Sequence, residues 1–286
     1  MDGKRRNLIQ LNVAVALWGI TALFAKTIEM PVSTLTMSRC AVAAVALLAY
    51  ILIARKGLAI RSRKDLVILL TSGVLIAVHW VTYFQSIRVS TVAVAIIALH
   101  TYPIMTILLE PLLFRERLHL TDVLMGVVVL VGIVVLVPHF DLSDKATQGV
   151  LWGLVSAVFF TARNLLARGS IRSYSGSTIM FYQVVVTAAV LLPFAPLTAG
   201  PKPGNAALQL LLLGVVFTAL PHTLFTAAFA NLKVKTVSII ATLLPIYGAL
   251  FAWLLLSEVP TWRTAIGGGI VLAAVAFETV RSAGST

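Results

Sequence analysis

Charged residues are scarce in this sequence, and acidic residues are the scarcest of them. Only 11% of the 286 residues are charged, with 10 Asp and Glu against 22 Lys and Arg. A soluble domain carries about 25% charged residues. Hydrophobic residues make up 59% of the chain, and the mean hydropathy is +1.00. This composition excludes an ordinary soluble domain and indicates a protein that crosses a membrane many times.

Residues for covalent or metal chemistry are also few. Cys40 is the only cysteine, so an intramolecular disulfide is excluded, and no thiol-relay or metal-binding motif is present. The apolar segments bring together no paired carboxylates and no nucleophile beside a base, and the sequence has no phosphate-binding glycine loop. We therefore expect that the protein is not an enzyme and that it has no cofactor and no metal. A channel is disfavoured, because there is no carbonyl filter or ring of like charges.

Long apolar runs, in contrast, recur from end to end. About 20 helical residues cross the roughly 30 Å of hydrocarbon in a bilayer, and short segments such as "ARKGLAIRSRKD" separate runs of that length. The first run resembles a signal peptide, but it is too long and lacks a clean cleavage site, so we interpret it as an uncleaved span. The expected fold class is an all-α membrane protein with ten transmembrane helices, at 8–28, 33–54, 66–87, 91–113, 121–138, 149–168, 176–196, 206–229, 236–256 and 262–280.

The positions of the basic residues indicate how the chain is oriented. The formal net charge of +12 would suggest a nucleic-acid partner for a soluble protein. When the N-terminus is taken as cytoplasmic, most basic residues, such as Arg61, Arg115 and Arg281, fall on the inner side. Few fall on the outer side, and Lys145 and Arg263 are examples. Because cytoplasmic loops carry such an excess, we expect both termini in the cytoplasm and no nucleic-acid partner.

The chain contains an internal repeat. The stretch "PIMTILLEPLLFRERLHLTDVLMGVVVLVG", which starts at Pro103, aligns without gaps with "PIYGALFAWLLLSEVPTWRTAIGGGIVLAA", which starts at Pro245. We divide the chain into a first five-helix repeat, 1–140, and a second one, 141–286. Because five is odd, the second repeat enters the membrane from the opposite side, so the repeats are inverted. Inverted repeats are typical of secondary transporters, whose substrate sites lie near the midplane between the repeats.

These features resemble the drug/metabolite transporter superfamily and, within it, the EamA-type carriers. The matching segments are "ALWGITALFAK" at 16–26, "TMSRCAVAAVAL" at 36–47, and the passage 83–118 with its repeat 228–260. The most similar subgroup is the aromatic amino-acid exporters of bacterial inner membranes, the YddG-like carriers. The resemblance implies efflux of amino acids, aromatic and other neutral ones, and related metabolites from the cytoplasm. A carrier for other small metabolites or organic cations is the alternative.

The stretch "LIAVHWVTYFQS", residues 75–86, places polar and aromatic residues inside an apolar span. His79 and Tyr83 share one side of a helix, as do Trp80 and Tyr83. Such a side normally faces the bundle or a water-filled cavity, because unsatisfied polar groups in hydrocarbon are costly. We predict that these three residues bind the substrate. In the alternative interpretation His79 only ties two helices together, and Trp80 is an interfacial anchor.

Proton coupling is left open by the sequence. His79 is the only deep group that titrates near neutral pH, so coupling to protons would run through it. An uncoupled facilitator needs no such group.

Two prolines occupy equivalent positions in the repeats. Pro103 and Pro245 lie near the centres of the fourth and ninth spans, where proline removes a backbone donor from a helix interior. Their equivalence predicts hinges for alternating access, although proline is also tolerated in membrane helices for plain packing. Rings near these prolines and in the first span can stack on an aromatic substrate. The rest of the predicted substrate site therefore consists of Trp18, Tyr102 and Tyr247.

Charged residues in and near the spans have simpler expected roles. Arg39 lies about 9 Å from the outer face at 1.5 Å per residue, and we expect it to snorkel or form a structural ion pair rather than bind a substrate carboxylate. Glu116 and Glu258 fall at span ends, where we expect them to cap the next helix or pair with nearby arginines, such as Arg263. The expected partners of the chain are a small-molecule substrate, an amino acid, and membrane lipid, and we expect a monomer.

Overall fold

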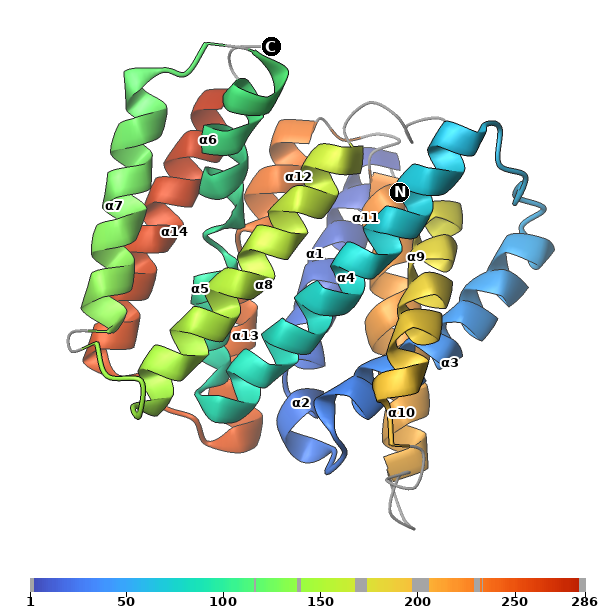
Figure 1. The fold of residues 1–286 in the computed structure, drawn as a ribbon, viewed down its shortest axis with the longest axis horizontal. Helices are drawn as coiled ribbons and strands as arrows, with labels where there is room; N and C mark the ends of the chain where they lie inside the picture. The colour runs from blue at the N-terminus through green and yellow to red at the C-terminus, as the bar shows by residue number, and fades with distance from the viewer. Residues whose placement is uncertain are drawn as a thin grey trace.

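The protein is a bundle of helices that lie side by side, with both termini toward the same end (Figure 1). The computed structural model describes residues 3–115, 117–137, 140–167, 174–196, 206–228, 232 and 234–282. Within these residues all regular structure is helical and there is no strand. The helices are α1 (Gly3–Thr21), α2 (Phe24–Thr27), α3 (Val32–Ile53), α4 (Arg63–Val89), α5 (Val92–Leu99), α6 (Tyr102–Phe114), α7 (Leu120–Leu136), α8 (Lys145–Ala167), α9 (Gly176–Leu191), the 3-10 helix η1 (Leu192–Phe194), α10 (Ala206–Gly214), the π-helix η3 (Val215–Ala219), α11 (Leu220–Ala228), α12 (Val234–Ala241), α13 (Leu244–Leu256) and α14 (Trp262–Ser282).

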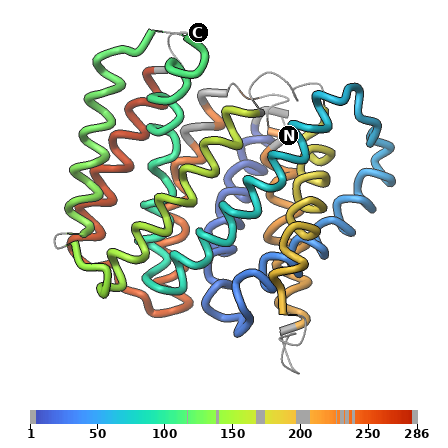
Figure 2. Tube along the Cα trace, viewed as in Figure 1, coloured from blue at the N-terminus to red at the C-terminus, as the bar shows by residue number. Residues whose placement is uncertain are grey.

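The lengths of these helices agree with the expected spans. In the described part of the chain, 8 helical segments are long and apolar enough to cross a membrane, and α7 and α13 are shorter apolar helices. Together they give the ten expected spans. The chain runs back and forth through the bundle in successive spans (Figure 2). The prediction of an all-α membrane protein with many spans is confirmed.

Helices of the two halves contact one another in a symmetric pattern. α3 packs on α9, and α7 packs on α14, which pairs the second span with the seventh and the fifth with the tenth. α4 packs on α8, which pairs the third span with the sixth, and α1 packs on α11, which pairs the first span with the eighth. These two pairs are equivalent when the halves are exchanged. Exchange of two equivalent halves would produce this pattern. The division at residue 140 stays a prediction.

Small residues bring some of these helix pairs close together. A Cβ atom on Gly132 of α7 would lie 2.9 Å from the carbonyl oxygen of Gly267 on α14. Glycine is therefore required for this approach of the two backbones. Close packing of this kind holds membrane helices together where the lipid gives no hydrophobic driving force.

The fourth and ninth spans are each broken near the middle. α5 ends at Leu99 and α6 begins at Tyr102, while α12 ends at Ala241 and α13 begins at Leu244. The last residue before each break is four residues before a proline, Pro103 or Pro245. A proline ring clashes with the carbonyl group four residues earlier, which explains why both helices end there.

The prolines themselves lie in the first turn of α6 and α13. The backbone N–H has no partner within a helix at such a position, so proline costs little there. The prediction that they lie in helix interiors was therefore wrong. At the first break, side chains hydrogen-bond to backbone carbonyl groups, and Thr101 Oγ1 donates to Ala98 O at 2.8 Å. His100 Nδ1 lies 3.0 Å from Ile96 O.

An ionic contact fastens the end of the bundle that is opposite the termini, where α2 lies (Figure 1). Lys26 Nζ forms an ion pair with Glu258 Oε1 and donates to Ser90 O at 2.8 Å. Glu258 Oε2 accepts a hydrogen bond from Val92 N, in the first turn of α5, at 2.9 Å. We call these four residues the far-end latch. Glu258 was expected to pair with a nearby arginine, such as Arg263, or to cap the next helix, and that expectation was wrong. Glu116 lies outside the described residues.

Candidate functional site

Aromatic rings from three helices form a continuous group in the middle of the bundle. Tyr102 of α6 meets Phe160 of α8 edge to face, with ring centroids 4.8 Å apart. Phe160 stacks on His79 of α4 at 4.7 Å, and His79 is parallel to Tyr83 at 6.2 Å. Because α4 and α6 belong to the first predicted repeat and α8 to the second, this group lies at the interface of the two halves.

A second group of rings continues from Trp80. His222 of α11 lies 6.4 Å from Trp80 and 4.9 Å from Trp18 of α1, measured between ring centroids. Trp18 Nε1 lies 3.4 Å from His222 Nδ1. Trp80 and His79 are adjacent, with their centroids 6.5 Å apart. The structure thus brings five of the predicted site residues into one series of rings, Tyr102, Tyr83, His79, Trp80 and Trp18.

The position of His222 depends on an irregular helix. The π-helix η3 comes directly before α11, and a widened turn of this kind frequently occurs at functional sites. His222 Nδ1 lies 2.7 Å from Thr218 O, while Thr21 Oγ1 of α1 donates to Phe217 O at 2.9 Å. The first contact orients the imidazole against the preceding turn, and the second joins η3 to α1. Sequence analysis did not include His222 among the predicted site residues, although it lies beside a proline in an apolar span.

His79 also joins two helices directly. Its side chain is 4% exposed, and its Nδ1 lies 2.8 Å from Ser156 Oγ of α8. Ser156 Oγ is also 2.9 Å from the His79 carbonyl oxygen, to which it can donate. The alternative interpretation, that His79 ties helices together, therefore describes part of its role. The His79 ring also stacks on Phe160 and Tyr83, so His79 belongs to the aromatic group as well.

Tyr247 lies apart from this series of rings. Its hydroxyl donates to Asn12 Oδ1 of α1 at 3.3 Å, and its ring is parallel to Phe251 at 6.4 Å. The side chain packs in the same apolar cluster as Trp18. Tyr247, which belongs to the second predicted repeat, therefore packs against α1. Its contact with the substrate stays a prediction.

Two basic side chains complete the surroundings of the rings. The Arg39 guanidinium carbon lies 4.1 Å from the centroid of the Trp80 ring, and the side chain is 2% exposed. The expectation that Arg39 snorkels or forms an ion pair was wrong, because it turns inward to α4 and has no ion pair among the described residues. Arg163 Nη2 donates to Gln183 Oε1 of α9 at 2.9 Å. Sequence analysis missed Arg163 and Gln183 as site residues, although both are polar positions inside apolar spans.

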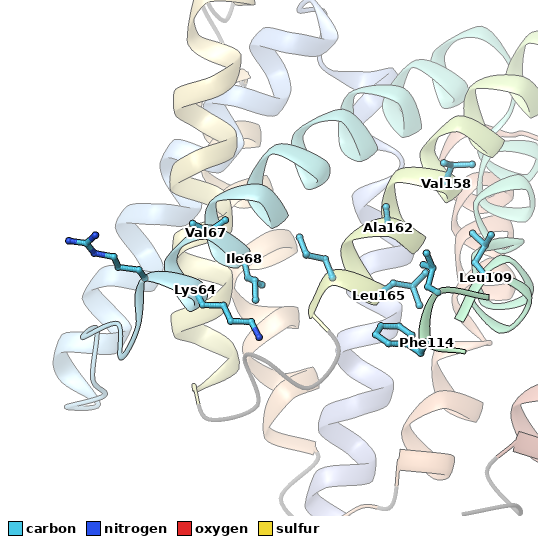
Figure 3. Close-up of a pocket in the computed structure, with 11 residues that line it drawn as sticks. Lys64, Val67, Ile68, Leu109, Phe114, Val158, Ala162 and Leu165 are labelled. Carbon is cyan, nitrogen blue, oxygen red and sulfur yellow. The ribbon is translucent and has the colours of Figure 1, made fainter. Parts of the chain in front are cut away.

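A groove lies beside these rings, between α4, α6 and α8, with a volume of about 850 Å³. Figure 3 shows Leu109 and Phe114 of α6 facing Leu165 and Ala162 of α8, with Lys64 at one edge. Among the described residues, the charged ones that line it belong to the first turn of α4. None of the predicted site residues line this groove. Its apolar walls offer no partners for the charged groups of an amino acid.

The described residues do not provide a metal site, because no group of three His, Cys, Asp or Glu side chains lies together among them. The arrangement of rings and basic groups suits noncovalent binding of a small polar molecule with an apolar or aromatic part.

Comparisons with known proteins agree with this description. The model of the EamA-like transporter family matches residues 7–137 and 147–279. The "Uncharacterized transporter YxxF" of Bacillus subtilis (strain 168) is 24% identical over 288 residues, which cover 98% of this chain and 92% of that protein. The "Pseudopaline exporter CntI" of Pseudomonas aeruginosa (strain UCBPP-PA14) is 30% identical over 249 residues, 86% of this chain and 85% of that protein.

A solved crystal structure shares the fold. It superposes with a TM-score of 0.66 at 20% sequence identity and covers 97% of this chain and 99% of that chain. None of these relatives shows the predicted similarity to YddG-like exporters, which stays a prediction.

Proposed function

Because the chain belongs to the EamA-like transporter family, we propose that this membrane transporter exports amino acids and related metabolites by alternating access. Aromatic and other neutral amino acids are the first substrates to test. The observation that carries the proposal is the series of rings between the two halves, from Tyr102 to Trp18. A substrate held between two inverted repeats is released when one half rocks against the other. The similarity to a protein named as an exporter supports the direction of transport.

The predicted site residues have complementary roles in this proposal. His79 and Tyr83 offer hydrogen bonds to the charged groups of an amino acid, while Trp80, Trp18 and Tyr102 stack on its side chain. A ring can also meet an ammonium group through a cation–π contact, which contributes about 2 kcal/mol when desolvated. Tyr247 contributes at the edge of the site, next to Trp18 in the same cluster. No step requires a cofactor or covalent chemistry.

Organic cations are the alternative substrate class, and the surroundings of the rings disfavour it. The positive charges of Arg39 and Arg163 act on His79, and both repel a cation. A carrier for cations would need an intramembrane carboxylate. Glu110 of α6 is the acid that the sequence places deep in a span.

Counterflow tests the proposed function directly. Purified protein in liposomes loaded with unlabelled phenylalanine or threonine is expected to accumulate the radiolabelled amino acid transiently, because a carrier exchanges substrate across the membrane. The same measurement with an imposed proton gradient distinguishes proton coupling from facilitated diffusion. Liposomes that show no counterflow of any amino acid would rule out the proposal.

Orientation is the first structural prediction. We propose that the chain lies in the bacterial inner membrane as a monomer, with both termini in the cytoplasm, because the basic residues gather on the side of the termini. A reporter fused at Arg61 is then expected to be cytoplasmic and one fused at Asp141 to be external. An external reporter at Arg61 would overturn this orientation and the inverted-repeat argument with it.

Hinge motion at the broken spans is the second prediction. We expect Pro103→Ala and Pro245→Ala to slow transport several-fold while substrate affinity changes little. Alanine restores a backbone donor at the break, so α5 can continue into α6, and α12 into α13, as a straighter helix. Counterflow rates and apparent affinities measured for each variant check this. Pro31→Ala, at the N-terminus of α3, is the control. Unchanged turnover in both hinge variants would show that the prolines only pack.

A further inference from the structure

Two arginines in the middle of the bundle have no carboxylate partner among the described residues. Arg39 is 2% exposed, and the ion pairs of the described chain involve Lys26 and Arg281 instead. Three donor atoms of these arginines are buried without a hydrogen bond: Nε and Nη2 of Arg39, and Nε of Arg163. A buried charge with unmade hydrogen bonds is costly, so a transient partner is the natural explanation.

The contacts of Arg39 hold its guanidinium in place but leave one edge open. The guanidinium carbon lies 4.1 Å from the centroid of Trp80 and 4.7 Å from that of Phe84, which is cation–π geometry. The two donors without a partner, Nε and Nη2, lie on the same edge of the guanidinium. That edge binds a carboxylate through two parallel hydrogen bonds.

Among the described residues, the hydrogen-bond partners of Arg163 are neutral. Its Nη1 donates to Asn164 Oδ1 at 3.0 Å, and its Nη2 donates to Gln183 Oε1 at 2.9 Å. Gln183 is fully buried, and its Nε2 is a further buried donor without a partner. Donors therefore outnumber acceptors around Arg163 as well.

Positive charge gathers where these groups meet the rings. Both arginines interact electrostatically with His79 and with His222. The four side chains come from α3, α8, α4 and α11, and therefore from both predicted repeats. Among the described residues, no ion pair with a carboxylate involves either arginine, and a substrate can supply that negative charge.

We propose that Arg39 and Arg163 each bind one carboxylate of the transported substrate, so that the preferred substrate is an amino-acid-like compound with two carboxylate groups. This proposal rests on the proposed function and names its substrate class. A neutral amino acid supplies one carboxylate and leaves the second arginine unpaired, and no acidic partner for its ammonium pairs with these arginines among the described residues. A compound with two carboxylates satisfies both arginines, while its apolar part lies among the rings.

Binding of a graded series of probes to the purified full-length protein tests this proposal. The probes share a phenyl ring and differ in charge: phenethylamine has only an ammonium, 3-phenylpropionate one carboxylate, phenylalanine both groups, and benzylsuccinate two carboxylates. We expect benzylsuccinate to bind at least tenfold more tightly than 3-phenylpropionate, and phenethylamine not to bind. Equal binding of phenethylamine and 3-phenylpropionate would overturn the proposal.

Substitution of Arg163 tests whether this arginine binds the second carboxylate of the substrate. Arg163→Gln is expected to abolish the tenfold preference for benzylsuccinate over 3-phenylpropionate while it retains binding of 3-phenylpropionate. Arg88→Gln is the matched control, because the Arg88 donors are already bonded to Ala25 O at 2.8 Å and Ile28 O at 3.0 Å. Its preference should be unchanged. A preference that survives in Arg163→Gln would overturn the assignment.

Arg39→Lys gives an independent measurement if Arg163→Gln does not fold. Lysine keeps the positive charge but lacks the two-donor edge, so we expect all carboxylate probes to bind at least tenfold more weakly. Unchanged binding would contradict the proposal.

Counterflow distinguishes failure of this inference from failure of the proposed function. If phenethylamine inhibits phenylalanine counterflow as well as 3-phenylpropionate does, only this inference is overturned. Probe binding without any counterflow would overturn only the proposed function.

Discussion

Replacement of Glu258 by glutamine is expected to open the end of the bundle that is opposite the termini. The far-end latch joins α2, the start of α5 and the segment after α13 through Lys26 and Glu258. Hydrogen bonds to charged groups contribute about 1.5–3 kcal/mol each, but the Lys26 and Glu258 side chains are 25% and 16% exposed, so screening reduces this. A net loss of about 1–2 kcal/mol shifts a two-state ratio roughly 5–30-fold.

Spin labels can measure that shift. Cysteines at Thr27 and Val259, introduced after Cys40→Ser, place labels on exposed positions on either side of the latch. In Glu258→Gln, and equally in Lys26→Met, we expect the population with a longer label-to-label distance to increase. Arg263→Gln, which removes a charge from the same end but not from the latch, serves as the control. Distance distributions that match the wild type in both latch variants would show that the latch does not hold this end closed.

The partner of Glu258 shows why local sequence could not predict the latch. The expectation of Arg263 rested on nearness in the chain, whereas Lys26 is 232 residues away. Ser257 has a left-handed conformation, with φ of 56°, and Glu258 N donates to Ala252 O at 3.1 Å. This C-terminal closure of α13 fixes the direction of the chain at Glu258. Tertiary packing then decides which basic residue it meets.

The spans, in contrast, were predictable because the bilayer limits the choice. A backbone in hydrocarbon must form helices, and the length of each apolar run sets the length of each span. Proline was a less complete guide. It indicated an irregularity at Pro103 and Pro245, but only the structure shows that the helix ends four residues earlier and restarts just before the proline.

The candidate site was predictable only in part, because depth in the membrane does not give the direction of a side chain. Hydropathy placed Arg39 near the outer face and favoured snorkelling. The position of α4 beside α3 instead turns the guanidinium toward Trp80 and Phe84. Arg163 and Gln183 meet across two helices, and no periodicity within one span indicates such a pair.

Replacement of His79 by alanine is expected to lower the apparent affinity for substrate about tenfold, the effect of losing about 1.4 kcal/mol of binding. In the proposed site His79 and Tyr83 hydrogen-bond the charged groups of the substrate at the interface of the halves. Tyr83→Ala is expected to have a similar effect. Apparent affinities from counterflow at several substrate concentrations provide the measurement, and protein yield and melting temperature provide the check on folding.

Ser156→Ala separates the two roles of His79. The serine hydroxyl is the partner of His79 Nδ1 at 2.8 Å, so its removal weakens the link between α4 and α8 by about 1 kcal/mol but keeps the imidazole and its stacking on Phe160. If His79 binds substrate, Ser156→Ala lowers the melting temperature and retains the apparent affinity, whereas His79→Ala loses both. Equal losses of stability and affinity in the two variants would mean that His79 only ties the halves together, and that the substrate passes elsewhere.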